Sequence, residues 1–206
     1  MTEENDTRNR ILAEAVKEFK EKGFLNSSLR NISKAAGGTT GAFYRYYDSK
    51  EALFGALVDE HAEYIINMYN ETIDHFEGLP DGQQTEKMNQ VTHDCMREAI
   101  DYIYDNLDAF RLLVMCSEGT KYADFQDRLV EREVESTYFY LETLEKTGHH
   151  VEPINKNLIH IIASGQFKCI FETVAHNMPK EEALEYVTQL RRFYTAGWEE
   201  LMGVSF

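Results

Sequence analysis

The residues best suited to chemistry lie close together near the N-terminus, between Ser27 and Leu53. The stretch from Thr39 to Tyr47 contains two threonines, three tyrosines and one arginine, together with one glycine, one alanine and one phenylalanine. Only Phe43 and Tyr47, four residues apart, need to face a core, which leaves the other side chains on an outward face. Hydroxyls, a guanidinium and small residues on a protruding helix suit the groove of a DNA duplex and its flanking phosphates.

Two short helices joined by a glycine turn are predicted to position these side chains. The first stops at Gly37 and Gly38, because glycine tolerates the left-handed conformation of a helix end. The hydroxyl of Thr39 caps the second, predicted over residues 40–47, and Ser49 caps a third helix that starts at Lys50. The apolar face of the first helix consists of Leu29, Ile32, Ala35 and Ala36.

Catalytic and metal chemistry has little support in the sequence. It has no HExxH, CxxC or phosphate-binding glycine motif. His93 and Cys95, two residues apart, point to different sides of a helix, and His149-His150 follows Gly148 in an expected loop. The run Glu131–Glu133 is interpreted as a solvated helix face. The sequence therefore predicts no enzyme, no metal site and no cofactor.

The order of residues in this N-terminal stretch resembles the DNA-binding head of the TetR family of transcriptional repressors. The resemblance is carried by Gly23-Phe24, Ser27, Ile32, Ala35-Ala36-Gly37, the run from Gly41 to Tyr47, Ser49-Lys50-Glu51 and Leu53. It implies, position by position, that phosphates are contacted by Ser28, Tyr44, Tyr46 and Lys50. It implies likewise that the residues near base edges are Thr39, Thr40, Ala42 and Arg45. A phosphate contact by Lys50 is also supported by its position, because its positive charge stands at a helix N-terminus, which already favours anions.

The charge distribution agrees with DNA contact by the N-terminal part alone. The whole chain carries a net charge of −15. Residues 1–50 hold nine Lys and Arg against seven Asp and Glu, whereas residues 51–206 hold twelve against twenty-nine. The acidic remainder repels a polyanion, so binding is expected to involve the head only and to weaken with salt.

The composition of the 206 residues indicates one or two small domains. Three widely spaced cysteines favour reduced thiols in a cytoplasmic protein. The polar N-terminus lacks a secretion signal, and no long apolar run lacks charges, so no membrane-spanning segment is predicted.

Helical periodicity extends over the rest of the chain, and no alternating strand pattern appears. After a first helix over residues 7–22, a long amphipathic helix starts at Lys50 and ends before a loop over residues 77–85. Further helices are predicted over residues 86–104, 107–116, 122–146, 154–176 and 180–202, with Pro153 at a helix start. The predicted fold is all-α, with a helix-turn-helix DNA-binding domain over residues 1–50 and a helical ligand-binding and dimerisation domain over residues 51–206.

The last two predicted helices carry apolar bands broader than a single core-facing stripe requires, which indicates a partner surface. The alternative is that both helices are simply buried in one domain. The family resemblance implies that this pair forms a four-helix bundle with a second copy. The predicted interface residues are Ile162, Phe167, Ile170, Val187, Leu190, Tyr194, Trp198 and Leu201.

The resemblance also implies a small-molecule site in the body, whose occupation moves the connecting helix and separates the two heads. Such a site is expected to be largely apolar with a few polar groups. The alternative for each candidate residue, taken singly, is that it belongs to the hydrophobic core and does not line a binding site. The predicted lining residues are Tyr64, Met68, Met96, Phe110, Met115, Phe139, Gln166 and Phe167.

These features lead to the hypothesis of a homodimeric, cytoplasmic transcriptional repressor on a palindromic double-stranded operator, released by a small-molecule effector. Two alternatives stay open. One is a ligand-independent regulator, an activator or DNA organiser with the same head. The other is an α-helical enzyme or carrier that uses the aromatic body, in which the head is an incidental hairpin.

Overall fold

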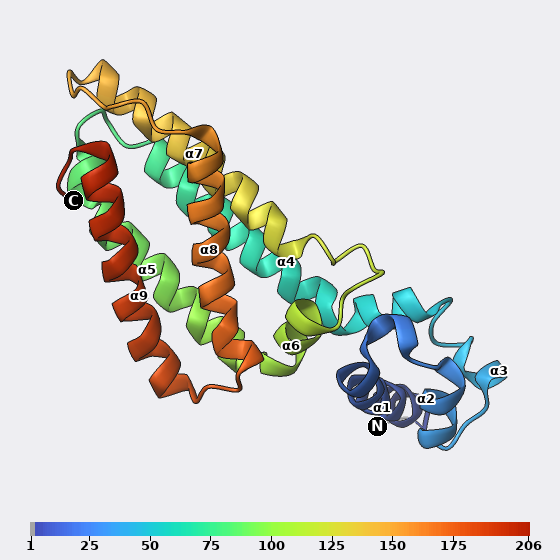
Figure 1. Cartoon of the computed structure of the whole chain (residues 1–206). Helices are drawn as coiled ribbons and strands as arrows, with labels where there is room; N and C mark the ends of the chain where they lie inside the picture. The colour runs from blue at the N-terminus through green and yellow to red at the C-terminus, as the bar shows by residue number, and fades with distance from the viewer. Residues whose placement is uncertain (1–2) are drawn as a thin grey trace. The chain divides into compact units, whose positions relative to one another are not determined.

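The computed structural model describes residues 3–206, with side chains from residue 5 onward. All regular elements in this part of the chain are α-helices, which confirms the predicted all-α fold (Figure 1). The helices are α1 Glu3–Asn26, α2 Leu29–Ala35, α3 Thr40–Phe43, α4 Lys50–Glu77, α5 Gln83–Asp105, α6 Leu107–Met115, α7 Phe125–Lys146, α8 Lys156–Ala175 and α9 Lys180–Met202.

The chain forms two compact units. The head unit contains the residues up to Glu63 together with Asn106–Phe125, and the body unit contains Tyr64–Asp105 and Gln126–Phe206. The long helix α4 is therefore shared between them. The predicted division at residue 50 differs from this one, because the first half of α4, α6 and the following turn make their contacts within the head.

An aromatic cluster forms the core of the head. The rings of Phe19 and Phe54 lie 5.1 Å apart, and both pack against Phe24. Gly23 interrupts α1 with a left-handed backbone (φ 69°), which turns the chain so that Phe24 can enter this core. Burying three aromatic side chains supplies much of the free energy that holds so small a unit together.

Helix α6 packs against α1 within the head. The Phe24 N–H donates to the Cys116 carbonyl at 3.0 Å, and Lys20 pairs with Asp108 at 2.7 Å. Beyond α6, the Tyr122 hydroxyl donates to Asp59 of α4 at 2.5 Å. These partners are far apart in sequence, so periodicity alone does not place α6 in the head.

In the body, α9 packs against α5 and α8 (Figure 1). One apolar cluster is centred on Phe76, Tyr140 and Leu144, and another on Ile100, Ile170 and Val187. Helix α8 begins at Lys156, where the Asn155 side chain accepts from the Asn157 N–H at 2.9 Å. The predicted helix start beside Pro153 is therefore wrong, because Asn155 provides the cap.

Helix α8 is also long and apolar enough, by length and composition, to cross a membrane. A third of its apolar window is buried inside the body, and core helices of globular proteins commonly pass the same test. The sequence-based prediction that no segment spans a membrane thus stays a prediction for this helix.

Candidate functional site

The glycine turn precedes α3, as the sequence predicts, but α3 ends at Phe43, whereas the predicted helix spans residues 40–47. Gly37 adopts the left-handed conformation (φ 80°), while Gly38 does not. Thr39 caps α3 by accepting from the Ala42 N–H at 3.2 Å, and Ser49 caps α4 by accepting from the Ala52 N–H at 2.9 Å. The face predicted for α2 is wrong at Ala35, which is exposed, while Ile32 and Ala36 are buried as predicted.

The candidate DNA-contact side chains lie on the outer side of this turn. Phe43 and Tyr47 are buried, as predicted, with their rings 5.8 Å apart. Tyr44 is 54% exposed and Arg45 is exposed, while Thr40 and Tyr46 are half-buried. No side-chain hydrogen bond to another described residue occupies the polar groups of Thr40, Tyr44, Arg45 or Tyr46. Their donors are available to a ligand.

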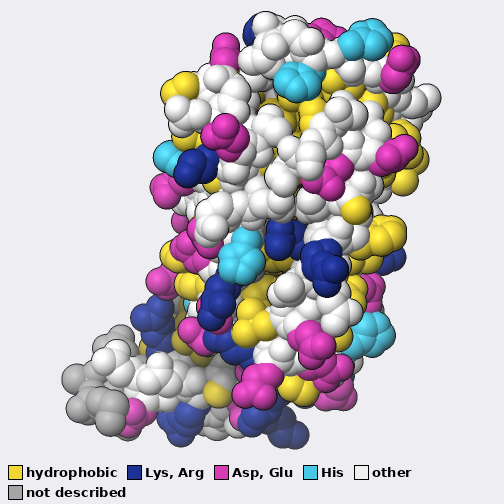
Figure 2. Space-filling view, turned by 90° about the vertical axis from the view of Figure 1, so that its left-hand side faces the viewer, with side chains coloured by type: hydrophobic (Ala, Val, Ile, Leu, Met, Phe, Trp, Pro, Cys, Tyr) yellow, Lys and Arg dark blue, Asp and Glu magenta, His cyan; other side chains and the backbone are white. Residues whose placement is uncertain are grey.

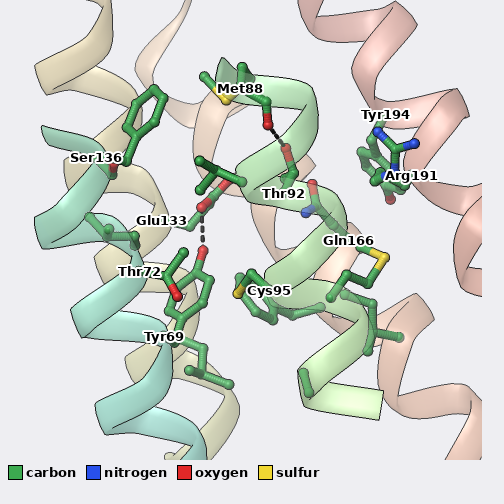
Figure 3. A pocket seen from close by; sticks show the side chains of 18 of the residues that line it. Tyr69, Thr72, Met88, Thr92, Cys95, Glu133, Ser136, Gln166, Arg191 and Tyr194 are labelled. Carbon is green, nitrogen blue, oxygen red and sulfur yellow. Dashed lines mark hydrogen bonds between the residues drawn. The ribbon is translucent and has the colours of Figure 1, made fainter. Parts of the chain in front are cut away.

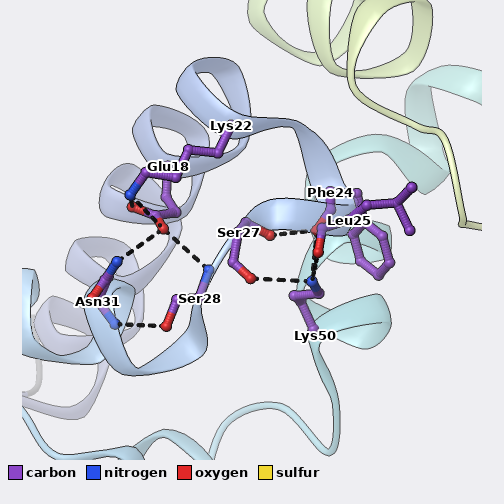
Figure 4. A network of polar contacts seen from close by, with 8 residues as sticks. All are labelled: Glu18, Lys22, Phe24, Leu25, Ser27, Ser28, Asn31 and Lys50. Carbon is purple, nitrogen blue, oxygen red and sulfur yellow. Dashed lines mark hydrogen bonds and ion pairs between the residues drawn. The ribbon is translucent and has the colours of Figure 1, made fainter.

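Lys50 does not fit its predicted role. Its ammonium donates to the carbonyls of Phe24 (2.6 Å), Ser27 (3.1 Å) and Leu25 (3.3 Å), as Figure 4 shows. It also lies 4.5 Å from the centre of the Phe24 ring, and burial lowers its pKa. Three carbonyl partners use all three of its protons. In this structure Lys50 fastens the start of α4 to the end of α1, and a phosphate contact would require those bonds to break.

Glu18 joins α1 to α2 in the same region (Figure 4). One carboxylate oxygen accepts from the Ser28 N–H at 3.1 Å, from Asn31 Nδ2 at 3.2 Å and from Lys22 at 3.1 Å. Burial raises the pKa of this carboxyl, but the hydrogen bonds outweigh it, so the net shift is downward. Ser28 also caps α2 through its side chain. These bonds fix the angle between α1 and the helix-turn-helix.

A cavity of about 180 Å³ lies within the body, lined by α4, α5, α7, α8, α9 and the C-terminal Phe206. Its walls are mostly apolar and aromatic, as expected of a small-molecule site. Polar groups are spread over all five helices. They are Tyr69, Thr72, Thr92, Cys95, Glu133, Ser136, Thr137, Gln166, Arg191, Tyr194 and Thr195.

Glu133 of α7 is the one carboxylate among the described lining residues. The Tyr69 hydroxyl of α4 donates to its Oε2 (Figure 3). The Tyr69 ring lies edge-on to Phe167, with 5.4 Å between the ring centres. Burial raises the pKa of Glu133, while Tyr69 and Arg132 oppose that shift. The interpretation of this position as a solvated helix face is wrong. Its spacing from Leu129, Thr137 and Tyr140 places it on the inward stripe of α7, a signal the sequence did contain.

Arg191 of α9 is the basic group of the described lining residues, and it comes from the opposite wall to Glu133 (Figure 3). Its Nη1 donates to Asn89 at 2.9 Å, while its buried Nε has no partner among the described residues. On α5, burial raises the pKa of the Cys95 thiol to about 11, so this thiol stays protonated at neutral pH. The cavity is thus equipped to bind a molecule, with an acceptor on one wall and a donor on the other.

The structure separates the predicted pocket residues into two groups. Met68, Met96, Gln166 and Phe167 line the cavity. The other four predictions are wrong: Phe110 is buried in the head, Met115 is 58% exposed, and Phe139 is also exposed. Tyr64 stacks on Tyr102 and donates to Glu98 away from the cavity.

The predicted dimer residues are divided similarly. Phe167, Ile170 and Val187 are buried inside the body, so their assignment to a partner surface is wrong. Tyr194 and Trp198 line the cavity, while Ile162, Leu190 and Leu201 are half-buried. Other apolar residues of these two helices reach the surface instead, and Figure 2 shows apolar side chains at the surface of the body among charged ones. They are Leu158 and Ile161 of α8 and Phe193 of α9.

Metal ligation finds no support among the described residues, which contain no group of three or more His, Cys, Asp or Glu side chains placed to hold an ion. His150 is exposed and pairs with Glu152 at 3.5 Å, and His93 lies beside Asp94. The predicted solvation of the His149-His150 pair agrees with these positions.

Comparison with known proteins finds similarity in the head and in the fold. Residues 11–57 match the family model of bacterial regulatory proteins, tetR family. The HTH-type transcriptional regulators YdgC of Bacillus subtilis and UidR of Escherichia coli K12 are 40% and 36% identical over 55 and 73 residues, which are 27% and 35% of this chain. These matches span 28% and 37% of the two relatives, so this chain is matched to only about a third of their length.

Solved structures resemble nearly the whole chain. A TetR-family transcriptional regulator from Bordetella parapertussis superposes with a TM-score of 0.57 at 17% identity, covering 89% of this chain and 92% of that one. The fatty acid degradation regulator FadR from Bacillus halodurans gives a TM-score of 0.55 at 14% identity, covering 90% and 92%. At such low identity the likeness concerns the fold.

The fold and the exposed turn define a helix-turn-helix protein with a helical, cavity-containing body. More closely, its head is similar to the family model of bacterial regulatory proteins, tetR family, over residues 11–57, and its fold resembles that of solved TetR-family regulators.

Proposed function

We propose that this protein is a homodimeric, cytoplasmic, DNA-binding transcriptional repressor, released from a palindromic operator by a small molecule bound in the body cavity. The observation that carries the proposal is the combination of the exposed α3 face with a largely apolar cavity in the body of the same chain. A surface for DNA and a site for a small molecule are the two parts that ligand-controlled binding requires.

The DNA contacts are proposed for the outer face of the glycine turn. Thr40, Ala42 and Arg45 meet base edges, with the Thr39 hydroxyl beside them, while Tyr44, Tyr46 and Ser28 donate to phosphates. Lys50 is left out of the phosphate set because its protons are already used. A single four-residue helix makes few base contacts, so specificity requires two heads on symmetric half-sites.

Dimerisation is proposed through the surface apolar residues of α8 and α9. Phe193 is 73% exposed and Ile161 is 63% exposed, which is unusual for side chains of their size. The exposed Ala196 and Gly197 lie close to Phe193 along α9 and allow close approach of a partner helix.

Signal transfer from cavity to head is proposed to follow the chain itself, which crosses between the units after residues 63, 105 and 125. A cavity-lining residue stands near each crossing: Ile65 on α4, Ile103 on α5 and Leu129 on α7. A ligand that shifts these helices acts directly on α4 and, through α5, on α6. Because α6 packs on α1, a shift of α6 also reaches α1 within the head.

The test begins by selecting operator sequences from a random double-stranded library with the purified protein. Thr40→Ala is expected to change the preferred sequence, because a base-edge contact is altered. Ala52→Ser, on an exposed position of α4 beyond the turn, serves as the control and is expected to keep it. Absence of binding to any duplex at low salt would reject DNA recognition. DNA binding that no cavity ligand alters would instead favour the ligand-independent regulator.

A further inference from the structure

The carboxyl group of Glu133, which lines the cavity, has only part of its hydrogen-bonding capacity used by the described residues. Glu133 Oε2 accepts from Tyr69, and no other described side chain or backbone group donates to this carboxyl. Enclosing a carboxylate costs free energy unless a cation or several donors compensate. One phenol hydroxyl is a small compensation for a group that faces an apolar space.

No basic residue forms a hydrogen bond or an ion pair with Glu133 among the described residues. Its neighbour Arg132 turns away and donates to Asp74 at 2.7 Å and to Glu77 at 3.2 Å. Arg191, on the opposite wall, donates to Asn89 instead. Among the described residues Glu133 takes part in no ion pair. The cavity wall formed by α7 therefore carries a carboxyl group that has no ion-pair partner among the described residues.

The aromatic walls of the cavity suit an organic cation. Tyr69, Phe76, Tyr140, Phe167 and Trp198 all line the cavity. Aromatic faces attract a desolvated cation by roughly 2 kcal/mol, in addition to ordinary apolar contact. A cavity of about 180 Å³ has room for a molecule of one ring with a short chain.

We propose that the cavity binds a small organic amine in its ammonium form, whose N–H groups donate to Glu133 and whose apolar part packs on the aromatic walls. This rests on the proposed function in that the amine is the effector. At the far wall, the unpartnered Nε of Arg191 needs only a neutral acceptor, such as an ether or hydroxyl oxygen on the same molecule. An anion paired with Arg191 is the competing possibility that the experiment must separate.

The experiment uses three probes with one skeleton: phenylbutylamine, phenylbutanol and phenylbutyrate. Trp198 is the single tryptophan of the chain and lines the cavity, so its fluorescence reports binding without a label. In the full-length protein at neutral pH, the amine is expected to bind about tenfold more tightly than the alcohol, and the carboxylate is expected to bind weakest.

Glu133→Gln keeps the shape and an acceptor for Tyr69 while removing the charge. It is expected to abolish the preference for the amine and to leave binding of the alcohol unchanged. The control Glu131→Gln removes an exposed charge from the same helix and is expected to keep the wild-type order. If Glu133→Gln fails to fold, the wild-type ranking of the three probes still decides the matter.

Three results would overturn the inference: tightest binding of the carboxylate, no amine binding at about 1 mM, or an amine preference that survives Glu133→Gln. Operator release is measured separately. Amine binding that depends on Glu133 but leaves DNA affinity unchanged would uphold the amine site and reject the ligand-controlled repressor. If only an anion releases the protein from DNA, the amine site is rejected and the ligand-controlled repressor is upheld.

Discussion

Two charged residues show how a single side chain changes role with its surroundings. Lys50 stands at a helix N-terminus, where its charge suggests an anion contact, yet three carbonyls enclose its ammonium. Glu133 stands in a charged run, yet its carboxyl faces an aromatic cavity. In both cases the sequence shows the charge, and only the neighbours decide what it does.

Lys50→Met tests the role of Lys50. The methionine keeps an apolar stem over Phe24 but loses three hydrogen bonds, so the head is expected to lose about 1–2 kcal/mol of stability, with water replacing part of the loss. Chemical denaturation measures this, with the exposed Lys34→Met as the control. The salt dependence of DNA binding should stay unchanged. If the slope of log K against log salt concentration becomes shallower by about 0.9 in the variant, Lys50 does contact a phosphate.

Glu133 predicts a pH dependence of stability. Burial raises its pKa in the folded chain above the unfolded value of about 4.3, so the folded chain holds this proton to higher pH. Stability is therefore highest below the unfolded pKa and falls as pH rises through the folded one. The groups facing this carboxyl are Tyr69 of α4 and Cys95 of α5, with Arg132 beside it on α7.

The comparison of Glu133→Gln with wild type isolates this contribution. The variant lacks the titrating group, so its melting temperature relative to wild type is expected to increase steadily as pH rises across that window. Thermal unfolding followed by circular dichroism measures the difference, and Glu131→Gln should run parallel to wild type. A pH-independent difference for Glu133→Gln would contradict the buried carboxyl.

At the scale of elements, the attachment of α6 to the head is the feature with the largest consequence. Its turn passes so close to the end of α1 that Gly119, with φ +84°, lies against Leu25. A Cβ at this position would come within 2.3 Å of a Leu25 methyl carbon. A displacement of α6 therefore cannot leave the end of α1 untouched.

Gly119→Ala is expected to destabilise the protein by about 1–2 kcal/mol, mainly because alanine disfavours the left-handed backbone. The exposed Leu25 side chain can move aside, so Leu25→Ala combined with Gly119→Ala should recover only the clash and not the backbone cost. Gly38→Ala is the control, since its φ is not left-handed and a Cβ there meets its nearest atom at 3.7 Å. Equal stability of Gly119→Ala and Gly38→Ala, by thermal unfolding, would refute the argument.

At the scale of the whole molecule, the proposed dimer uses the surface of α8 and α9 to bring two heads to one operator. Phe193 is largely exposed, and an exposed apolar surface of this kind is typical of a protein interface. Phe193→Glu is expected to weaken dimerisation by about tenfold or more, because a charge would enter an apolar interface. Sedimentation at several protein concentrations measures this.

The matched control for the dimer is Gln189→Glu, an exposed polar position one turn away on α9 that hydrogen-bonds within its own helix. It adds the same charge and is expected to leave the association unchanged. If Phe193→Glu and wild type show the same molecular mass throughout, dimerisation through this face is wrong, and specificity would have to come from elsewhere.

The sequence by itself determined the local structure. Thr39, Ser49, Gly23 and Gly37 set helix ends through caps and left-handed backbone, and the bounds of α9 agree with those predicted from periodicity. These signals act over a few residues, so one sequence contains them in full. The helix-turn-helix head was recognisable for the same reason.

Tertiary structure alone decided which residues meet. In the folded chain α6 and its Phe110 belong to the head, and Phe110 does not line the cavity. The Lys50 ammonium donates to backbone carbonyls, and Glu133 lines the cavity. A helical stripe tells which side of a helix is buried, but several helices compete to cover each stripe. The partner is chosen by packing among residues distant in sequence, and no local pattern records that choice.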